Sequence, residues 1–515
     1  MLIVVVVLSL AAYRYSDMMM SEFRATDRIY KNVEAKALAD SGIQYTIALL
    51  SDKKALTGTL ANNPYDNESA FKDHKISEDA KGRFSIVTID YSSDSNTGTL
   101  PYKYGVSDES GRININALVR LDPSAGGIAY RTLMKLPNMT DEIAYAIIDW
   151  IDADDNISNT SSGAESSYYL DRQPAYRCKN APLDSIEELL LVRDVSPDLL
   201  FGNDLNRNGR RDPDEETSGE FSYGWAPYLT VYSREMNVDN EGTPRVNLNG
   251  RDLKKLYTDL KTALGEELAA FLIAYRIYDL PSTNSNNQNQ SSTKTGSIGD
   301  LVKKVETDMS ANQAPRSKRT VSSILQLIGS GVSVTTTQQV TQNGKTQSQQ
   351  VATLYYFPVT DANSAKDLLP KVLDKTTTVA DAELPGRINV NTASKAVLST
   401  LPGLVQSDID SIINKQPGTD PSRAADVIYQ TPAWLYIEAN ITPAKLQALE
   451  RYITARTQVY RIQAIGYFEK SGPVARIEAV VDISRDPVDL TIFRPRIIYY
   501  RDLSELGRTI DPRSN

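Results

Sequence analysis

Residues 1–51 read MLIVVVVLSLAAYRYSDMMMSEFRATDRIYKNVEAKALADSGIQYTIALLS, and this stretch decides the fold. Its first twelve residues are apolar and uncharged, but they make only about 18 Å of helix, and the hydrocarbon core of a membrane is about 30 Å thick. Continuing to residue 20 reaches that thickness and includes Arg14 and Asp17, which share one helical face and can pair. We therefore expect residues 1–20 to anchor the chain in a membrane.

A secretory signal peptide is the alternative interpretation of this stretch. No basic segment stands before the apolar run, and no cleavage-site pattern follows it. Apolar residues instead continue at steps of three and four, through Ile29, Val33, Ile43 and Leu50. The spacing predicts one long helix over residues 2–51 that is apolar all round at its start and amphipathic later.

Five further stretches have the pattern of β-strands. Two follow the helix, at 83–91 and 102–106, and three lie near the end of the chain, at 460–468, 475–483 and 495–501. Alternation of apolar and polar residues in 475–483 is typical of a sheet with one covered face, and the long helix is the expected cover. The sequence therefore predicts an α+β fold in which an antiparallel sheet is split between both ends of the chain, with a large helical insertion over residues 108–456.

Composition excludes several classes of function. The 515 residues include 56 Lys+Arg and 65 Asp+Glu, so the net charge of −9 repels polyanions and disfavours nucleic acid as a partner. Cys178 is the single cysteine and His74 the single histidine. Catalytic Ser-His-Asp sites, Cys-His sites and His-rich zinc sites are therefore poor hypotheses, and Cys178 is expected to be a small buried residue.

One motif occurs three times: Arg, aliphatic, Asn, aliphatic, Asn, at 112–116, 245–249 and 387–391. Each copy leads into a segment with helical apolar spacing, which predicts one small helical module used three times. We expect the repeated arginine to orient the strand that opens the module or to pair with a nearby carboxylate.

Residues 397–404 resemble a helix-hairpin-helix, which some competence and repair proteins use to grip DNA phosphates. Such hairpins need a second glycine two residues after the first, and this chain has Val405 there. Basic and acidic residues are also balanced around the motif, whereas a phosphate-binding surface has an excess of Lys and Arg. A DNA-binding protein of a competence apparatus is therefore the alternative, and protein packing is the favoured role of the modules.

The stretch DLNRNGRRDPDE, residues 204–215, matches the twelve-residue calcium-loop pattern. The pattern predicts ligands from five side chains and the Arg210 carbonyl, with Gly209 at the bend; the side chains are Asp204, Asn206, Asn208, Asp212 and Glu215. Arg211 and Pro213 depart from paired EF-hands, so we expect a lone structural calcium loop. The alternative is an acidic surface turn.

Taken together, these features resemble the K-type minor pseudopilins of type II secretion, the general secretion pathway protein K family. The resemblance is carried by AKALADSG, DESGRININ, DWIDADD, GAE and PLDSIEEL, at 35–42, 108–116, 149–155, 163–165 and 182–189. It implies a non-enzymatic subunit at the tip of a periplasmic pseudopilus, held by one span in the inner membrane, that helps to start filament assembly and protein export. The implied partners are other minor pseudopilins, the major pseudopilin and secreted substrate.

The resemblance also implies calcium in the helical part of the chain. The candidate ligands are Asp149, Asp152, Asp154 and Glu165, with Asp149 and Asp152 one helical turn apart. A solvated helix end is the alternative. Metal-dependent hydrolysis at these acids is a third hypothesis, but it lacks a histidine ligand and an evident base.

We expect seven segments along the chain. They are an anchor at 1–20, a pseudopilin helix with its first strands at 21–107, two helical modules with the calcium loop at 108–282, a low-complexity linker at 283–299, a small α/β unit with a hairpin of strands 332–341 and 350–359 at 300–380, the third module at 381–456, and closing strands at 457–515.

Overall fold

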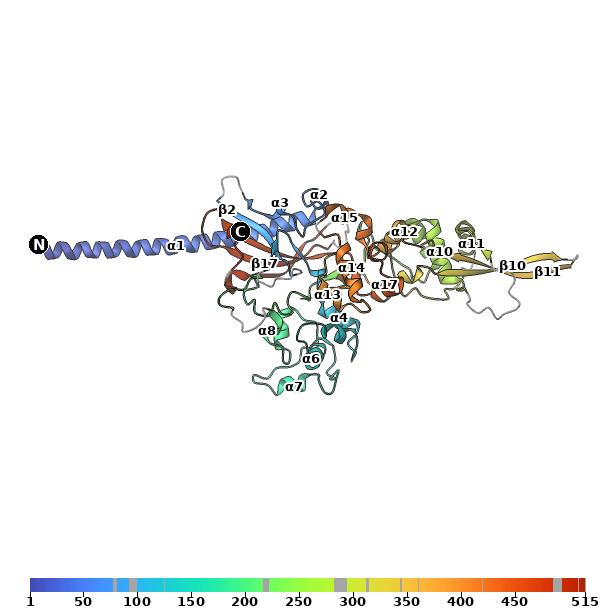
Figure 1. Ribbon diagram of the computed structural model, residues 1–515, viewed down its shortest axis with the longest axis horizontal. Coiled ribbons are helices and arrows are strands. Elements are labelled where there is room, and N and C mark those ends of the chain that lie inside the picture. Colours follow the sequence, from blue (N-terminus) through green and yellow to red (C-terminus); the bar gives the residue numbers. More distant parts are fainter. Residues whose placement is uncertain are drawn as a thin grey trace.

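A computed structural model gives the fold. It describes residues 1–76, 81–91, 100–124, 126–215, 222–281, 294–311, 315–342, 345–359, 361–418, 420–484, 493–507 and 509–514. Helix α1 covers Leu2–Ser51, as the sequence predicts, and its first part projects from the body as a free rod (Figure 1). Its buried residues begin at Ala35, so only the last third of α1 belongs to the core.

An antiparallel sheet carries this last third of the helix. Its strands follow the order β1 (His74–Lys75), β2 (Gly82–Ile89), β16 (Val459–Phe468), β17 (Ala475–Asp482) and β18 (Arg496–Asp502), with β3 (Tyr102–Lys103) on β2 and β4 (Ser107–Asp108) on β16. The predicted union of strands from both ends of the chain is therefore confirmed. The strand predicted over 102–106 is shorter than expected: β3 ends at Lys103, and the chain bends at residues 104–105 before β4.

Close approach between α1 and the sheet depends on a glycine. A Cβ at Gly466 on β16 would lie 2.0 Å from the Ala35 carbonyl oxygen, so a side chain there would push the helix away. Around this contact Ile43, Ile47 and Leu50 of α1 pack on apolar residues of the sheet in one buried cluster. The helix is therefore the cover of one sheet face, as predicted.

Each copy of the repeated motif opens with a two-residue strand that pairs with a later strand. The pairs are all parallel: β5 (Ile113–Asn114) with β6 (Leu229–Thr230), β8 (Val246–Asn247) with β12 (Thr376–Thr377), and β14 (Ile388–Asn389) with β15 (Ile453–Thr454). We call residues 113–230, 246–377 and 388–454 modules 1, 2 and 3. In each module, therefore, the last strand lies beside the first strand and closes the segment.

The modules are mainly helical. Module 1 contains α4 (Ile115–Leu121), α5 (Ile128–Leu133), α6 (Asp141–Ile151), α7 (Ser166–Leu170), η2 (Ile186–Leu191) and α8 (Pro197–Phe201). Module 2 contains α9 (Leu253–Leu264), α10 (Glu266–Ile277), α11 (Ile298–Ser310), η3 (Leu325–Leu327) and α12 (Ala362–Lys375). Module 3 contains α13 (Lys395–Thr400), α14 (Gln406–Lys415), α15 (Pro421–Ala425), η4 (Val427–Gln430), α16 (Trp434–Ile437) and α17 (Pro443–Leu449).

Local sequence sets the helix ends. The Asp252 side chain accepts hydrogen bonds of 3.0 Å from the amides of Lys254 and Lys255, which starts α9, and Gly265 ends it at φ +93°. One continuous apolar core runs through all three modules, with Trp225 and Trp434 fully buried in it. The remaining elements are α2 (Lys53–Thr57), α3 (Glu68–Phe71), η1 (Glu109–Gly111), β7 (Arg234–Met236) paired with β13 (Glu383–Pro385), η5 (Leu503–Leu506) and η6 (Pro512–Ser514).

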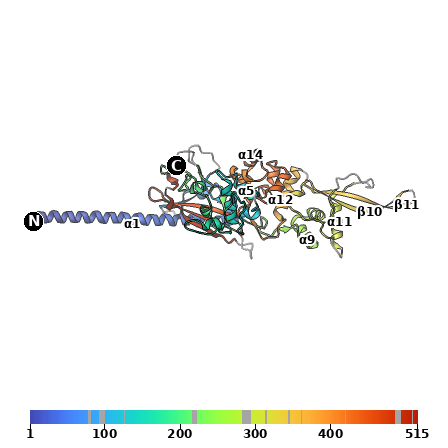
Figure 2. The ribbon, with the colours of Figure 1, turned by 90° about the horizontal axis from the view of Figure 1, so that it is seen from below.

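A long hairpin extends from module 2, at the opposite end of the molecule from the N-terminus (Figures 1 and 2). Its strands are β10 (Gly331–Gln342) and β11 (Lys345–Tyr356), with β9 (Lys294–Thr295) parallel to β11. The predicted hairpin is confirmed, although its second strand begins earlier than expected. Residues 343–344, at the expected turn, and most of the low-complexity linker lie outside the described residues, and the seven-segment division of the chain stays a prediction.

Candidate functional site

The three repeated arginines bind carboxylates. Arg112 lies 3.9 Å from Glu109, Arg245 lies 3.3 Å from Glu235, and Arg387 lies 2.6 Å from the other oxygen of Glu235. Burial alone would raise the pKa of Glu235, but Arg387, Arg245 and Arg456 outweigh it and lower the pKa to about 2. The expected carboxylate partners therefore exist, and Glu235 joins the openings of modules 2 and 3.

The second asparagine of each motif fixes the middle of its module. Asn116 donates to the Leu183 carbonyl at 2.9 Å and accepts from the Leu183 amide at 2.8 Å, and Asn249 holds Val321 in the same two-bond manner at 2.9 and 2.8 Å. In module 3, Asn391 donates to the Tyr429 carbonyl at 2.7 Å and accepts from the Trp434 indole at 2.8 Å. These side chains are used within the fold, a role that sequence reasoning missed because the partner is distant in sequence.

The 204–215 loop brings oxygen-bearing side chains together in a buried turn. Asp204, Asn206, Asn208 and Glu215 are all at most 5% exposed. Asp204 accepts from the amides of Asn208 at 2.9 Å and Gly209 at 2.8 Å, and the side-chain amides of Asn206 and Asn208 both donate to one Asp212 oxygen at 2.8 Å.

Further bonds close this loop on itself. Glu215 accepts from the amides of Asn206 at 3.3 Å and Asp212 at 3.1 Å, so the last residue of the loop reaches back to its third. Gly209, at φ +71°, makes the bend. Burial raises the pKa of Asp204 to about 6, and repulsion from Glu215 adds to this. The loop thus concentrates buried oxygens and negative charge, as a hard divalent cation requires.

The second set of candidate ligands divides into two. Asp149 is fully buried and accepts from the amides of Ser158 at 2.9 Å and Ala164 at 2.8 Å. Glu165 is 2% exposed, and both of its oxygens are buried without a hydrogen-bond partner, as is one oxygen of Asp152. Asp154 is exposed and accepts instead from Asn156. We call Asp149, Asp152 and Glu165 the acidic cluster.

Charge repulsion within the acidic cluster shifts its protonation. Burial, followed by the charges of Asp149 and Asp152, raises the pKa of Glu165 to about 8. Burial, followed by the charges of Asp149 and the nearby Asp154, raises the pKa of Asp152 to about 6. Across the described part of the chain, no three His, Cys, Asp or Glu side chains are grouped closely enough to hold a metal ion. As placed, therefore, neither candidate set is a complete cage of acidic ligands.

Residues 111–201 match the family model for Type II secretion system (T2SS), protein K. Over these residues the chain is similar to the type II secretion protein K family. The matched segment contains the first repeated motif and the whole acidic cluster, and it ends before Asp204. Similarity to this family therefore covers the acidic cluster but not the 204–215 loop.

Other comparisons add little to the family match. A solved GspK-GspI-GspJ complex from the type 2 secretion system of enterotoxigenic Escherichia coli is 10% identical with a TM-score of 0.35, and the match covers 94% of this chain and 99% of that one. A TM-score this low supports no argument about shared structure. No curated protein matches the chain.

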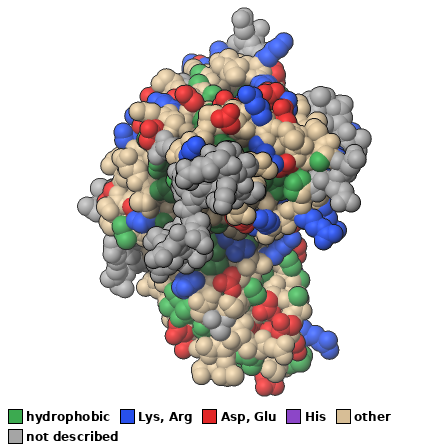
Figure 3. All heavy atoms as spheres, turned by 90° about the vertical axis from the view of Figure 1, so that its right-hand side faces the viewer, with side chains coloured by type: hydrophobic (Ala, Val, Ile, Leu, Met, Phe, Trp, Pro, Cys, Tyr) green, Lys and Arg blue, Asp and Glu red, His purple; other side chains and the backbone are tan. Residues whose placement is uncertain are grey.

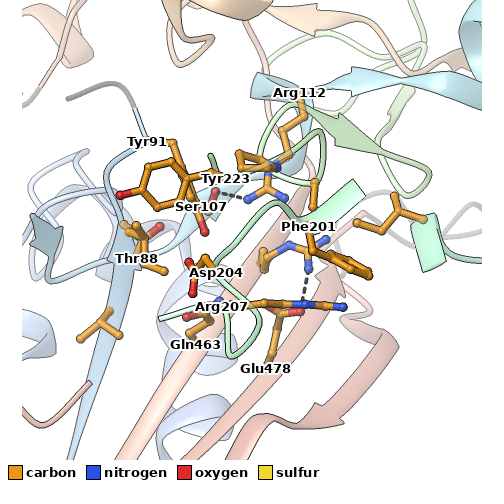
Figure 4. A pocket seen from close by; sticks show the side chains of 16 residues that line it. Thr88, Tyr91, Ser107, Arg112, Phe201, Asp204, Arg207, Tyr223, Gln463 and Glu478 are labelled. Carbon is orange, nitrogen blue, oxygen red and sulfur yellow. Dashed lines mark hydrogen bonds and ion pairs between the residues drawn. The ribbon is translucent and has the colours of Figure 1, made fainter. Parts of the chain in front are cut away.

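Two hollows lie at junctions between parts of the molecule. A cleft of about 880 Å³ separates modules 2 and 3 and is lined by Arg245, Arg387 and Arg456, but each of these arginines already pairs with a carboxylate. A pocket of about 60 Å³ lies between the 204–215 loop and the sheet, with Asp204 and Arg207 on one side and Gln463 and Glu478 on the other (Figure 4). Neither lining has the residues of a recognisable catalytic site.

The helix pair α13 and α14 lacks the surface of a phosphate-binding hairpin. Gly403 has φ +76° between the helices, but Lys395 pairs with Asp410 at 2.9 Å and Lys445 with Asp408 at 2.5 Å, so basic groups here are neutralised. Acidic and basic side chains are also interspersed over the face of the molecule that carries the β10–β11 hairpin (Figure 3). The charge balance predicted from the sequence holds in the structure.

Proposed function

We propose that this chain is the minor pseudopilin at the tip of a type II secretion pseudopilus, where it helps to start filament assembly and protein export. The family match over residues 111–201 and helix α1 together support the role. One end of α1 is an exposed apolar rod and the other is the cover of the sheet, so a single helix joins a membrane to a folded head. The matched family is a structural component of secretion, so we propose a structural role and no catalytic one.

The exposed apolar part of α1 is the proposed membrane anchor. By length and composition, α1 is the one helix in the described residues that can cross a membrane. Large apolar side chains from Met1 to Phe23 are exposed, which water disfavours and lipid accommodates. We infer a single span in the inner membrane, with the rest of the chain in the periplasm.

The size of the head supports a position at the tip. Modules 2 and 3 and the hairpin lie beyond the sheet from the exposed part of α1, and module 1 lies to one side of the sheet, so the head is both long and broad (Figure 1). A head this large would obstruct another subunit stacked above it. The proposed partners are the other minor pseudopilins, which correspond to GspI and GspJ, with the major pseudopilin below and secreted substrate in front.

Calcium is proposed as a structural cation at the 204–215 loop and at the acidic cluster. The fit rests on buried oxygens: a closed turn of oxygen-bearing side chains in the loop, and unpartnered oxygens on Glu165 and Asp152 in the cluster. A hard divalent cation would supply positive charge for these carboxylates and accept six to eight oxygen ligands. The residues that would hold it are those predicted from the sequence, apart from Asp154, which faces solvent.

The modules are proposed to be helix-hairpin-helix-like units that pack against protein. The alternative, DNA binding by module 3, predicts salt-dependent retention of the protein on DNA. Neutralised lysines and Val405 in place of a second glycine favour the protein-packing role.

The decisive experiment is co-purification of the full chain, extracted in detergent, with the other minor pseudopilins of its own system. A tip subunit should elute with them as a stable complex, and chelation of calcium should weaken that complex. A Val405→Gly variant serves as the control for DNA binding, because it restores the missing glycine. A chain that remains monomeric in the presence of calcium and all partners would contradict the proposed function.

A further inference from the structure

We propose that Arg476 of the sheet is a positioning residue for the 204–215 loop, so that a cation in this loop and the docking of module 1 on the sheet stabilise each other. The inference rests on the proposed calcium binding, and it adds a residue and a consequence that the loop pattern does not contain. It predicts that loss of Arg476 weakens cation binding although Arg476 is no ligand.

Arg476 holds the backbone of the loop directly. It lies on β17, is 0% exposed, and donates from Nη1 to the Arg207 carbonyl at 2.8 Å and from Nη2 to the Asn206 carbonyl at 2.5 Å. These carbonyls belong to the third and fourth residues of the loop, and the third residue, Asn206, is a predicted ligand. The guanidinium therefore fixes the backbone from which a ligand side chain extends.

Further contacts tie the same loop to the sheet region. The Leu100 amide donates to the Gly209 carbonyl at 2.8 Å, and a Cβ at Gly209 would lie 2.7 Å from the Ile89 side chain on β2. Arg207 also pairs with Glu187 at 3.0 Å, and Glu187 pairs with Arg501 of β18 at 3.1 Å. The bend of the loop thus lies directly on the sheet, and any disorder in the loop would loosen these contacts.

Beside the contact at Gly209, the junction between the loop and the sheet leaves a small cavity with both polar and apolar residues in its lining. The pocket of about 60 Å³ lies between them, and it is large enough for several waters (Figure 4). Arg461 Nη2 and Gln463 Oε1, from residues that line this pocket, are buried without a hydrogen-bond partner. Because apolar contact does not fill the junction, directed hydrogen bonds such as those of Arg476 determine where the loop lies.

Arg476 is a charged side chain that is fully buried. Burial lowers its pKa, with Glu478 opposing that effect, and its guanidinium donates to backbone carbonyl oxygens of the loop. A buried guanidinium is costly unless its bonds are well placed, so a merely space-filling role is a poor explanation for it. Its charge alone would repel a cation in the loop, whereas its bonds would preorganise the loop. The sign of the change in affinity on removing Arg476 therefore separates the two effects.

Thermodynamic linkage makes the coupling reciprocal. If an ordered, docked loop binds the cation better than a loose one, the cation must stabilise docking by the same factor. Two observables should then change together: the affinity of the loop for calcium, and the protection of the Leu100 amide, which is bonded to the loop across the junction.

The test is calcium binding and amide hydrogen exchange on the full chain in detergent, for wild type, Arg476→Gln and Arg476→Lys. Wild type should show calcium-dependent protection at Asn208, Gly209 and Leu100. Arg476→Gln should bind calcium at the loop roughly 10-fold more weakly, the size of effect typical for groups that orient metal ligands, and should lose that protection at Leu100. Arg476→Lys, which keeps the charge but not the two-pronged donor, should bind with intermediate affinity.

Matched controls keep the outcomes distinct. Arg496→Gln makes the same change on the neighbouring strand, at a side chain that is 60% exposed, and should bind calcium as wild type does. Asp204→Asn removes a ligand without touching Arg476, and should make exchange at Leu100 independent of calcium. Unchanged or tighter binding by Arg476→Gln, or Leu100 protection that persists in Asp204→Asn, overturns the positioning role alone. No calcium-dependent protection of the wild-type loop overturns the calcium proposal and this inference with it.

Discussion

At the scale of single residues, this molecule is held together by polar side chains that join segments far apart in the sequence. Glu235 binds Arg245 and Arg387, which open two different modules, and each second asparagine of the motif binds the middle of its own module. Glu235 is buried and its partners and the asparagines are partly buried, so leaving a partner unsatisfied costs more than the bond contributes when intact. The motif therefore repeats because each module needs the same polar fastening, and not because it binds a ligand three times.

Replacing Glu235 should destabilise the junction of modules 2 and 3. Glu235→Gln removes a buried carboxylate from between two partly buried arginines, and removing one partner of a buried ion pair costs up to about 3–5 kcal/mol. Because the pKa of Glu235 is lowered to about 2 from an ordinary 4.5, its stabilisation is present above about pH 4.5 and is lost as the pH falls toward 2. Chemical denaturation against pH should show this loss in wild type and a flatter profile in the variant. The control is Glu383→Gln, whose carboxylate is 51% exposed, and it should cost less than about 1 kcal/mol.

Replacing the second asparagine of the repeated motif should destabilise module 1 and module 2 to a similar extent. Asn116→Ala and Asn249→Ala each leave a backbone amide and a carbonyl unpaired, which should lower the free energy of unfolding by about 1–3 kcal/mol. Asn363→Ala, at an exposed position in the first turn of α12, should change it little. Thermal melting of the three variants checks this, and equal stability in all of them would contradict the fastening role.

At the scale of elements, the glycine between α1 and β16 sets how closely the helix lies on the sheet. Gly466→Ala would place a methyl group 2.0 Å from the Ala35 carbonyl oxygen and 2.6 Å from the Ala39 amide nitrogen, both on helical backbone that cannot rotate away. We expect a loss of several kcal/mol, in the range for overpacked cores or above it. Gly299→Ala is the matched control in α11, where no atom lies within 4 Å of the added group, and it should stabilise by up to about 1 kcal/mol. Urea denaturation of both variants gives the comparison.

Elements with a long periodic pattern could be predicted from the sequence. The apolar spacing gave α1 from Leu2 to Ser51, and alternation placed β16 and β17 within one residue of their observed ends. Strands of two residues carry no such pattern, so the partners Leu229–Thr230, Thr376–Thr377 and Ile453–Thr454 of the three opening strands could not be predicted. Each of these closing strands is placed beside the opening strand of its module by the packing of the helices between them.

The candidate sites were predictable to a similar degree. The 204–215 pattern named the side chains that the structure brings together, because a turn is specified locally by its own residues. Of the four acids predicted for the second site, the structure places Asp149, Asp152 and Glu165 in the acidic cluster and leaves Asp154 exposed, because residues close in sequence can differ in exposure; metal binding by any of them stays a prediction. Arg476 was missed, because its link to the loop spans 269 residues and depends on how module 1 lies on the sheet.

At the scale of the whole molecule, the two proposed cation sites lie in different parts of one head, so their contributions to stability should be separable. A ligand that binds only the folded state stabilises it by about 4 kcal/mol at 1,000 times its dissociation constant. Chelation should therefore lower the melting temperature of the full chain, and Asp204→Asn and Glu165→Gln should each remove part of that response. The double variant should melt at the same temperature with calcium and with chelator. Asp154→Asn is the control, because its exposed side chain lies outside the acidic cluster, and it should keep the full response. Differential scanning calorimetry measures all five proteins, and a response to calcium that survives the double variant would place the cation elsewhere in the molecule.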